Sequence, residues 1–89
     1  MTQGKRALAA GQYAQAVQLL QTAYDQSPSC DVTFYLGMAR YRLSEWDRAI
    51  VELKSASECD PRNAGALVAL GASYAAKHDD NRALAALES

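Results

Sequence analysis

The sequence predicts an all-α fold in which antiparallel helix hairpins stack into a right-handed superhelix. Glycine, alanine and leucine each recur at intervals of 33 or 34 positions. The positions are Gly4, Gly37 and Gly71, then Ala16, Ala49 and Ala83, and then Leu20, Leu53 and Leu87. A period of this length is typical of helical hairpin arrays, in which each repeat buries its apolar face against the next repeat. The chain would then form one domain of about two and a half to three repeats.

The apolar periodicity and the residues between the apolar runs divide the chain into helical segments. We expect six of them, at 2–10, 12–26, 30–43, 46–59, 64–77 and 80–89. They pair into an incomplete first repeat at 1–29, a complete repeat at 30–63 and an incomplete third repeat at 64–89. Connections of only a few residues make consecutive helices antiparallel neighbours.

Helix ends are marked by proline and by small polar residues. Pro28 and Pro61 are expected to end one hairpin before the next begins, since proline removes a backbone donor. Ser44 with Asp47 resembles a capping box before the fourth segment, and Asn63 precedes the fifth. The pair Asp79-Asp80 is expected to cap the sixth segment.

Gly37 and Gly71 each lie inside a helical pattern, where glycine costs about 1 kcal/mol relative to alanine. Their presence predicts that a neighbouring helix approaches closely at both positions. The repeated alanines are expected to serve the same contact from the opposite helix. The leucines four positions after those alanines lie on the same helical face and would fill the wider part of the gap.

The repeated residues resemble those of the tetratricopeptide repeat family, a family of stacked helix hairpins. The middle copy carries Leu36, Gly37, Ala49, Leu53, Ala56 and Pro61. The last copy carries Leu70, Gly71, Tyr74, Ala83 and Leu87, and the first carries Gly4, Ala16, Leu20, Ala23 and Pro28. Thr33 and Leu67 depart from the family's Trp, and Arg40 stands where Tyr74 supplies an aromatic side chain, which predicts looser packing of the middle hairpin.

This resemblance implies a protein-interaction scaffold, because the first helix of each hairpin in the family lines a concave groove. Transferred position by position, the peptide-binding groove comprises Lys5, Leu8, Asp31, Phe34, Tyr35, Met38, Tyr41, Arg42, Val68, Ala69 and Ala72. Its aromatic and Met side chains favour an apolar or amphipathic peptide or helix of a partner protein. Lys5, Asp31 and Arg42 would set specificity at the edges. The alternative for Phe34 or Tyr41 is simple packing against neighbouring helices.

Self-association is the second function that the sequence predicts. The last segment contains Leu84 and Leu87 with no further helix after them to cover these side chains. Exposed apolar helix faces bind partners. A dimer or a longer stack through the end helices, with exchange of helices as one form, is therefore expected.

Composition bears on several other classes of function. Nine basic and ten acidic residues give a net charge of −1, which disfavours nucleic-acid binding. The longest weakly polar run, 64–76, contains Gly and Ser and is too short to insert into a membrane. The start of the chain lacks the basic and apolar pattern of a secretory signal, so the compartment stays open with the cytoplasm favoured.

Catalysis is not expected, and no cofactor or metal is implied. Cys30 or Cys59 with His78 would supply a nucleophile and a base if they met, but a Cys-dependent enzyme ranks below binding, as does a secretion chaperone. Lys77 to Asp80 form a turn rather than a metal site in this interpretation. With two cysteines and no secretory signal, free thiols are expected. The alternative is a disulfide, since both ends of one hairpin lie at the same edge.

Overall fold

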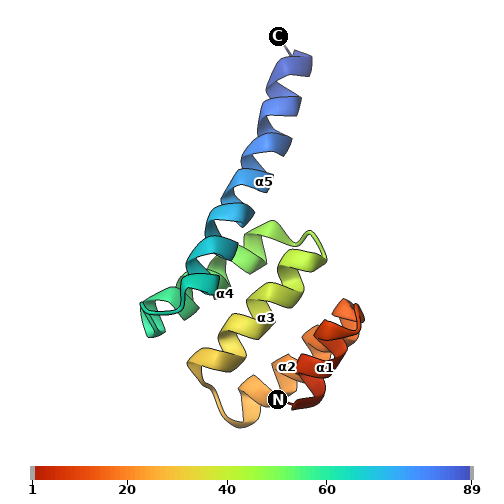
Figure 1. Cartoon of the computed structure of the whole chain (residues 1–89). Coiled ribbons are helices and arrows are strands. Elements are labelled where there is room, and N and C mark those ends of the chain that lie inside the picture. Colours follow the sequence, from red (N-terminus) through yellow and green to blue (C-terminus); the bar gives the residue numbers. More distant parts are fainter. Residues whose placement is uncertain (1, 89) are drawn as a thin grey trace.

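The computed structural model describes the backbone of residues 2–88 and the side chains of residues 2–77. Within this part, the chain forms five helices and no strand: α1 (Thr2–Ala9), α2 (Tyr13–Gln26), α3 (Cys30–Arg42), α4 (Trp46–Cys59) and α5 (Ala64–Glu88). Each helix packs against the next along the chain, and α3 also contacts both α1 and α5 (Figure 1). The predicted all-α class with packed neighbouring helices is confirmed.

The connections α1–α2 and α3–α4 have the same turn, 33 residues apart. Gly11 has φ 80° and Ser44 has φ 62°. The N–H of Gly11 donates to the carbonyl of Leu8 over 3.2 Å, and that of Ser44 donates to the carbonyl of Tyr41 over 3.0 Å. A left-handed residue therefore reverses the chain in both hairpins. Glycine adopts this conformation freely, whereas serine pays a steric cost.

Helix starts differ in how their backbone donors are satisfied. The expected capping box at Ser44 is wrong, because Ser44 forms the turn and Glu45 precedes α4 without a side-chain cap. The cap at Asn63 is confirmed, since its Oδ1 accepts from the N–H of Ala66 over 3.1 Å. Ser29 caps α3 in the same way, with Oγ 3.2 Å from the N–H of Val32. The cap at Ser29 was not predicted.

The close helix contact predicted at Gly37 is confirmed, and Gly4 makes an equivalent contact that was not predicted. A Cβ atom at Gly4 would lie 2.5 Å from Cδ2 of Leu20, and one at Gly37 would lie 2.8 Å from Cγ of Leu53. Both leucines are fully buried. Only glycine lets the two helices approach this closely, so these contacts fix the pairing of α1 with α2 and of α3 with α4.

The prediction of a close contact at Gly71 is wrong. Among the side chains that the structure describes, none lies within 4 Å of a Cβ atom built at Gly71. The reason lies in the backbone, because α5 continues from Ala64 to Glu88 as one helix and does not turn back between the expected segments 64–77 and 80–89 (Figure 1). The expected cap at Asp79-Asp80 is wrong for the same reason.

The expectation of free thiols is also wrong, because Cys30 and Cys59 form a disulfide. Cys30 is the first residue of α3 and Cys59 is the last residue of α4. Antiparallel packing brings these two ends to a Cα–Cα distance of 5.7 Å, which suits a disulfide. The bond therefore closes the open end of the α3–α4 hairpin, opposite the turn at Ser44.

Arg40 packs into the middle hairpin through polar contacts. Its Nε donates to both carboxylate oxygens of Glu52, over 3.1 and 3.0 Å. Nη1 donates to Glu45 over 3.2 Å, and Nη2 donates to the amide oxygen of Gln21 over 3.5 Å. A guanidinium thus replaces the aromatic ring expected at this position and connects α2, α3 and α4.

Candidate functional site

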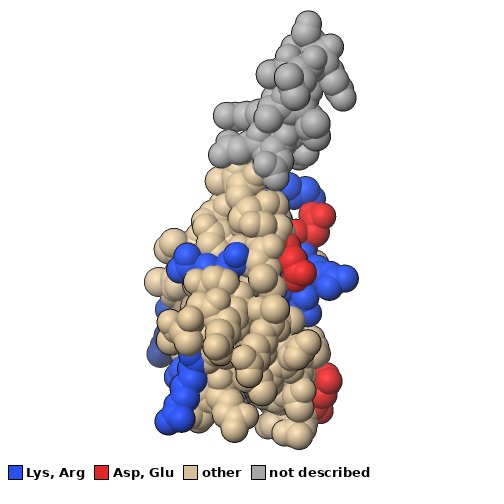
Figure 2. Space-filling view, turned by 90° about the vertical axis from the view of Figure 1, so that its right-hand side faces the viewer, with Lys and Arg blue, Asp and Glu red and all other residues tan. Residues whose placement is uncertain are grey.

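The candidate binding site is the side of the molecule formed by α1, α3 and α5, here called the first-helix face. It is defined by the predicted residues Lys5, Leu8, Asp31, Phe34, Tyr35, Met38, Tyr41, Arg42, Val68, Ala69 and Ala72. These come from three helices that contact one another through α3. Figure 2 shows one side of the molecule, on which charged side chains lie mostly toward the edges of a broad uncharged area.

Lys5, Tyr35 and Phe34 form one connected group on this face. Nζ of Lys5 lies over the ring of Tyr35, 4.9 Å from its centroid. The Tyr35 ring in turn lies 5.1 Å from the Phe34 ring, with the two planes tilted. A cation held over an aromatic ring and an adjacent second ring restrict one another's rotamers. The group therefore presents a fixed aromatic surface across α1 and α3.

Tyr41 is the centre of a second group at the other end of α3. Its ring packs edge-on against the ring of Trp46, with 5.4 Å between centroids. The guanidinium carbon of Arg42 lies 5.9 Å from the Tyr41 centroid. Trp46 was not among the predicted site residues. Its position just after the turn, five residues beyond Tyr41, is the signal that could have identified it.

Most of the large side chains on this face also pack against the core. Phe34, Met38 and Tyr41 are half-buried against a cluster of Ala49, Leu53 and Ala69. Leu8 and Tyr35 are half-buried against a second cluster, which contains Leu20 and Leu36. Each of these five side chains therefore contributes to packing and still leaves part of its surface accessible.

The remaining predicted residues differ in accessibility. Asp31 and Arg42 are exposed at the two ends of α3, where a partner can reach them. Val68 is 72% exposed and Ala72 is half-buried. Ala69 is only 6% exposed and belongs to the core, so it supports the face without offering contact area. Leu84 and Leu87, predicted for self-association, lie outside the residues whose side chains the structure describes.

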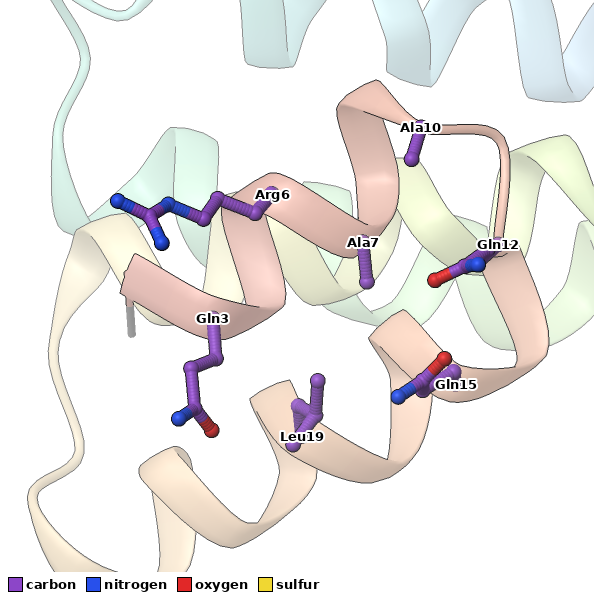
Figure 3. A pocket seen from close by; sticks show the side chains of 7 residues that line it. All are labelled: Gln3, Arg6, Ala7, Ala10, Gln12, Gln15 and Leu19. Atoms are coloured by element: carbon purple, nitrogen blue, oxygen red, sulfur yellow. The ribbon is translucent and has the colours of Figure 1, made fainter.

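A hollow of about 420 Å³ lies between α1 and α2, away from the predicted residues. Its lining consists of Gln3, Arg6, Ala7, Ala10, Gln12, Gln15 and Leu19. Figure 3 shows Ala7 and Leu19 pointing into the space between the two helices, with glutamine side chains around them. This hollow was not predicted, although three nearby glutamines in the sequence are a signal for it. The hollow is lined by apolar side chains and by glutamine amides. The amides offer hydrogen bonds, but no lining residue is a general acid or base.

The two cysteines considered as nucleophiles are bonded to each other. Cys30 and Cys59 are joined to each other, so neither offers a free thiolate, and the side chain of His78 lies outside the described residues. Within the described part, no three His, Cys, Asp or Glu residues gather closely enough to hold a metal ion. None of the described helices has the length and apolarity needed to cross a membrane.

The titration of Glu52 is perturbed by its surroundings. Burial raises its pKa above the usual value of 4.5, while the nearby Arg40 guanidinium acts in the opposite direction. Its carboxylate is held by Arg40 between α3 and α4 and lines small hollows on the side of the molecule away from Tyr35. We assign Glu52 to the structural network of Arg40 because its carboxylate is already engaged there.

No family model and no curated protein matches this chain.

Proposed function

We propose that this chain is a protein-interaction module of the tetratricopeptide repeat type, whose first-helix face binds an apolar or amphipathic segment of a partner protein. The observation that carries the proposal is the half-exposed aromatic band of Phe34, Tyr35 and Tyr41, held by Lys5 and Trp46. Rigid aromatic side chains give large contact area at low entropic cost, and they are frequent binding hot spots.

The repeated geometry supports membership in a hairpin array. The turns at Gly11 and Ser44, and the contacts of Gly4 with Leu20 and of Gly37 with Leu53, recur with the period of the sequence. In such an array, successive hairpins would be related by a right-handed superhelical twist. The same repeated geometry would then place α1, α3 and α5 side by side along a concave surface.

The disulfide suggests where the module works. Disulfides persist in oxidising compartments and are rare in the cytosol of most organisms. We propose an oxidising compartment in place of the cytoplasm favoured by the sequence alone. There the Cys30–Cys59 bond would keep α3, the helix with most of the aromatic band, fixed on α4.

The experiment is a selection of displayed peptides against the disulfide-bonded chain, followed by affinity measurement on two variants. The site variant is Phe34→Ala with Tyr35→Ala, and the matched control is Tyr24→Ala with Val51→Ala, which removes exposed apolar side chains from α2 and α4. Helicity and thermal unfolding of both are checked first. We expect the site variant to bind at least about tenfold more weakly, and the control to bind within about twofold of the parent.

Equal weakening by both variants would contradict a site on the first-helix face. Peptides without an apolar or amphipathic pattern would contradict the proposed class of partner. A site variant with normal helicity and undiminished affinity would place binding elsewhere, for instance in the hollow between α1 and α2.

A further inference from the structure

We propose that the Cys30–Cys59 disulfide is a thiol-exchange site, at which an external dithiol attacks the sulfur of Cys59 and releases Cys30 as a thiolate. The bond lies at the open end of the α3–α4 hairpin, opposite the turn at Ser44. The inference does not rest on the proposed function, because it concerns the chemistry of this bond and not the first-helix face.

The first step is access to the two cysteines. Cys59 is exposed at the last position of α4, whereas Cys30 is half-buried at the first position of α3. A thiolate must reach one particular sulfur of a disulfide, and the rate of exchange depends on which sulfur it can reach. Exposure therefore favours attack on Cys59.

The second step is the leaving group. Exchange is faster when the departing sulfur is stable as a thiolate. Cys30 lies at the N-terminal end of α3, where the partial positive charge of the helix favours a thiolate. Cys59 lies at the C-terminal end of α4, where the partial negative charge disfavours one. The helix ends thus favour Cys30 as the leaving group, in agreement with the exposure of Cys59.

The third step is the charge next to the bond. Glu58 and Asp60 flank Cys59, and Asp31 directly follows Cys30. Both Glu58 and Asp31 are exposed. Acidic side chains repel an anionic reactant and attract a cationic one. The reactant class is therefore a dithiol in a neutral or basic setting, such as an oxidoreductase whose active-site rim carries basic residues.

The exchange consists of two displacements. In the first, a thiolate of the dithiol bonds to Sγ of Cys59, and the Cys30–Cys59 bond breaks with its electron pair on Sγ of Cys30. In the second, the other thiolate of the dithiol attacks the sulfur that is bonded to Cys59 and releases Cys59 as a thiolate. The two released thiolates take up the two protons that the dithiol lost. The chain gains two electrons, and the dithiol is oxidised to a disulfide.

Exchange frees the start of α3 from the end of α4. Phe34 lies four positions after Cys30, so the released end is the one next to the aromatic band. The turn at Ser44 and the contact of Gly37 with Leu53 do not involve the disulfide. We therefore expect the hairpin to loosen at its open end while its other end stays packed.

The test maps the sulfur that is attacked in the folded chain. The disulfide-bonded chain is treated with excess cysteamine, quenched at early times with acid and N-ethylmaleimide, and digested with trypsin. Cys30 and Cys59 then lie in different peptides, residues 7–40 and 55–62. We expect cysteamine on Cys59 with N-ethylmaleimide on Cys30, in at least about fivefold excess over the reverse. Equal labelling, or more cysteamine on Cys30, would overturn the proposal.

Three small thiols test the effect of charge. After correction for the thiolate fraction and nucleophilicity of each, we expect cationic cysteamine to react at least about threefold faster than anionic mercaptoethanesulfonate, with neutral mercaptoethanol between them. Glu58→Gln should narrow this difference. The matched control is Asp47→Asn, an exposed acid near the other end of α4, which should leave it unchanged. Equal corrected rates for the three thiols would contradict the proposed class of reactant.

Low concentrations of urea distinguish attack on the folded chain from attack after unfolding. We expect the exchange rate to stay within about twofold below the unfolding transition, because an exposed Cys59 is reached without opening of the molecule. A rate that rises with urea as steeply as the unfolded population would overturn the proposal, since the sulfur would then react only in the unfolded chain.

Discussion

Gly37 shows how one residue sets the distance between two helices. A Cβ atom there would lie 2.8 Å from Cγ and 3.3 Å from the backbone nitrogen of Leu53. The backbone nitrogen is held in α4, so the strain cannot be relieved by the leucine side chain alone. The leucine also fills the core, with no exposed surface. Glycine and leucine therefore act as a matched pair.

We expect Gly37→Ala to lower the free energy of unfolding by about 1–3 kcal/mol, because overpacking outweighs the better helix propensity of alanine. Urea denaturation followed by circular dichroism measures it. In a Leu53→Ala background, the same Gly37→Ala change should be neutral or stabilising, since the overlap is gone. An equal loss in both backgrounds would mean that the cost does not come from Leu53.

Glu52 gives a pH dependence whose sign follows from its raised pKa. The folded state binds the Glu52 proton more tightly than the unfolded state, whose pKa is near 4.5. The favourable contribution of this group is therefore full below pH 4.5 and is lost as pH rises through the raised folded pKa. We expect Glu52→Gln to remove this fall in the unfolding free energy. Urea unfolding of the parent chain and of Glu52→Gln, from below pH 4.5 upward, measures the unfolding free energy at each pH. The same dependence on pH in both proteins would contradict the assignment of this effect to Glu52.

At the scale of elements, the α3–α4 hairpin is closed at both ends. The turn at Ser44 closes one end, and the Cys30–Cys59 disulfide closes the other across 29 positions of sequence. A covalent loop of this length restricts the unfolded chain and so stabilises the folded one. Because α3 contacts α1, α2, α4 and α5, this hairpin anchors the rest of the molecule.

Replacing both cysteines, as Cys30→Ser with Cys59→Ser, should lower the unfolding free energy by about 3–4 kcal/mol, the value expected for a loop of this size. Chemical reduction of the parent chain should have a similar effect. Urea unfolding measures both, and a thiol count on the unfolded, unreduced chain is the control. Two reactive thiols in that control would contradict the disulfide.

The helices differ in how far their sequence determines them. The 33-residue period predicted α1 to α4 and the close contact at Gly37, because these depend on local patterns and on neighbours in the chain. It did not predict the continuous α5. A turn near His78 competes there with helix-favouring residues such as Ala75 and Ala76, and neither local pattern decides the outcome. Disulfide geometry is likewise a property of the packed hairpin rather than of cysteine spacing.

The candidate site was predictable in residue type but not in arrangement. The resemblance to a repeat family pointed to Phe34, Tyr35 and Tyr41, whose half-exposed positions are consistent with both packing and binding. The stacking of Lys5 on Tyr35 and the contact of Trp46 with Tyr41 depend on how α1, α3 and α4 pack. Lys5 and Tyr35 lie on different hairpins, and Tyr41 and Trp46 lie on opposite sides of a turn, so periodicity alone does not reveal either contact.

At the scale of the whole molecule, the chain is elongated, with extents of 48 × 27 × 19 Å. The first-helix face draws on α1, α3 and α5, and α3 contacts both of the other helices.

The most direct test of the central proposal is a map of amide chemical-shift changes when a selected peptide is added to the isotopically labelled chain. We expect the largest changes on α1 and α3, around Lys5, Phe34, Tyr35 and Tyr41, and little change in the outer residues of α2 and α4. Changes concentrated instead on α2 and α4, or around the hollow between α1 and α2, would contradict binding at the first-helix face.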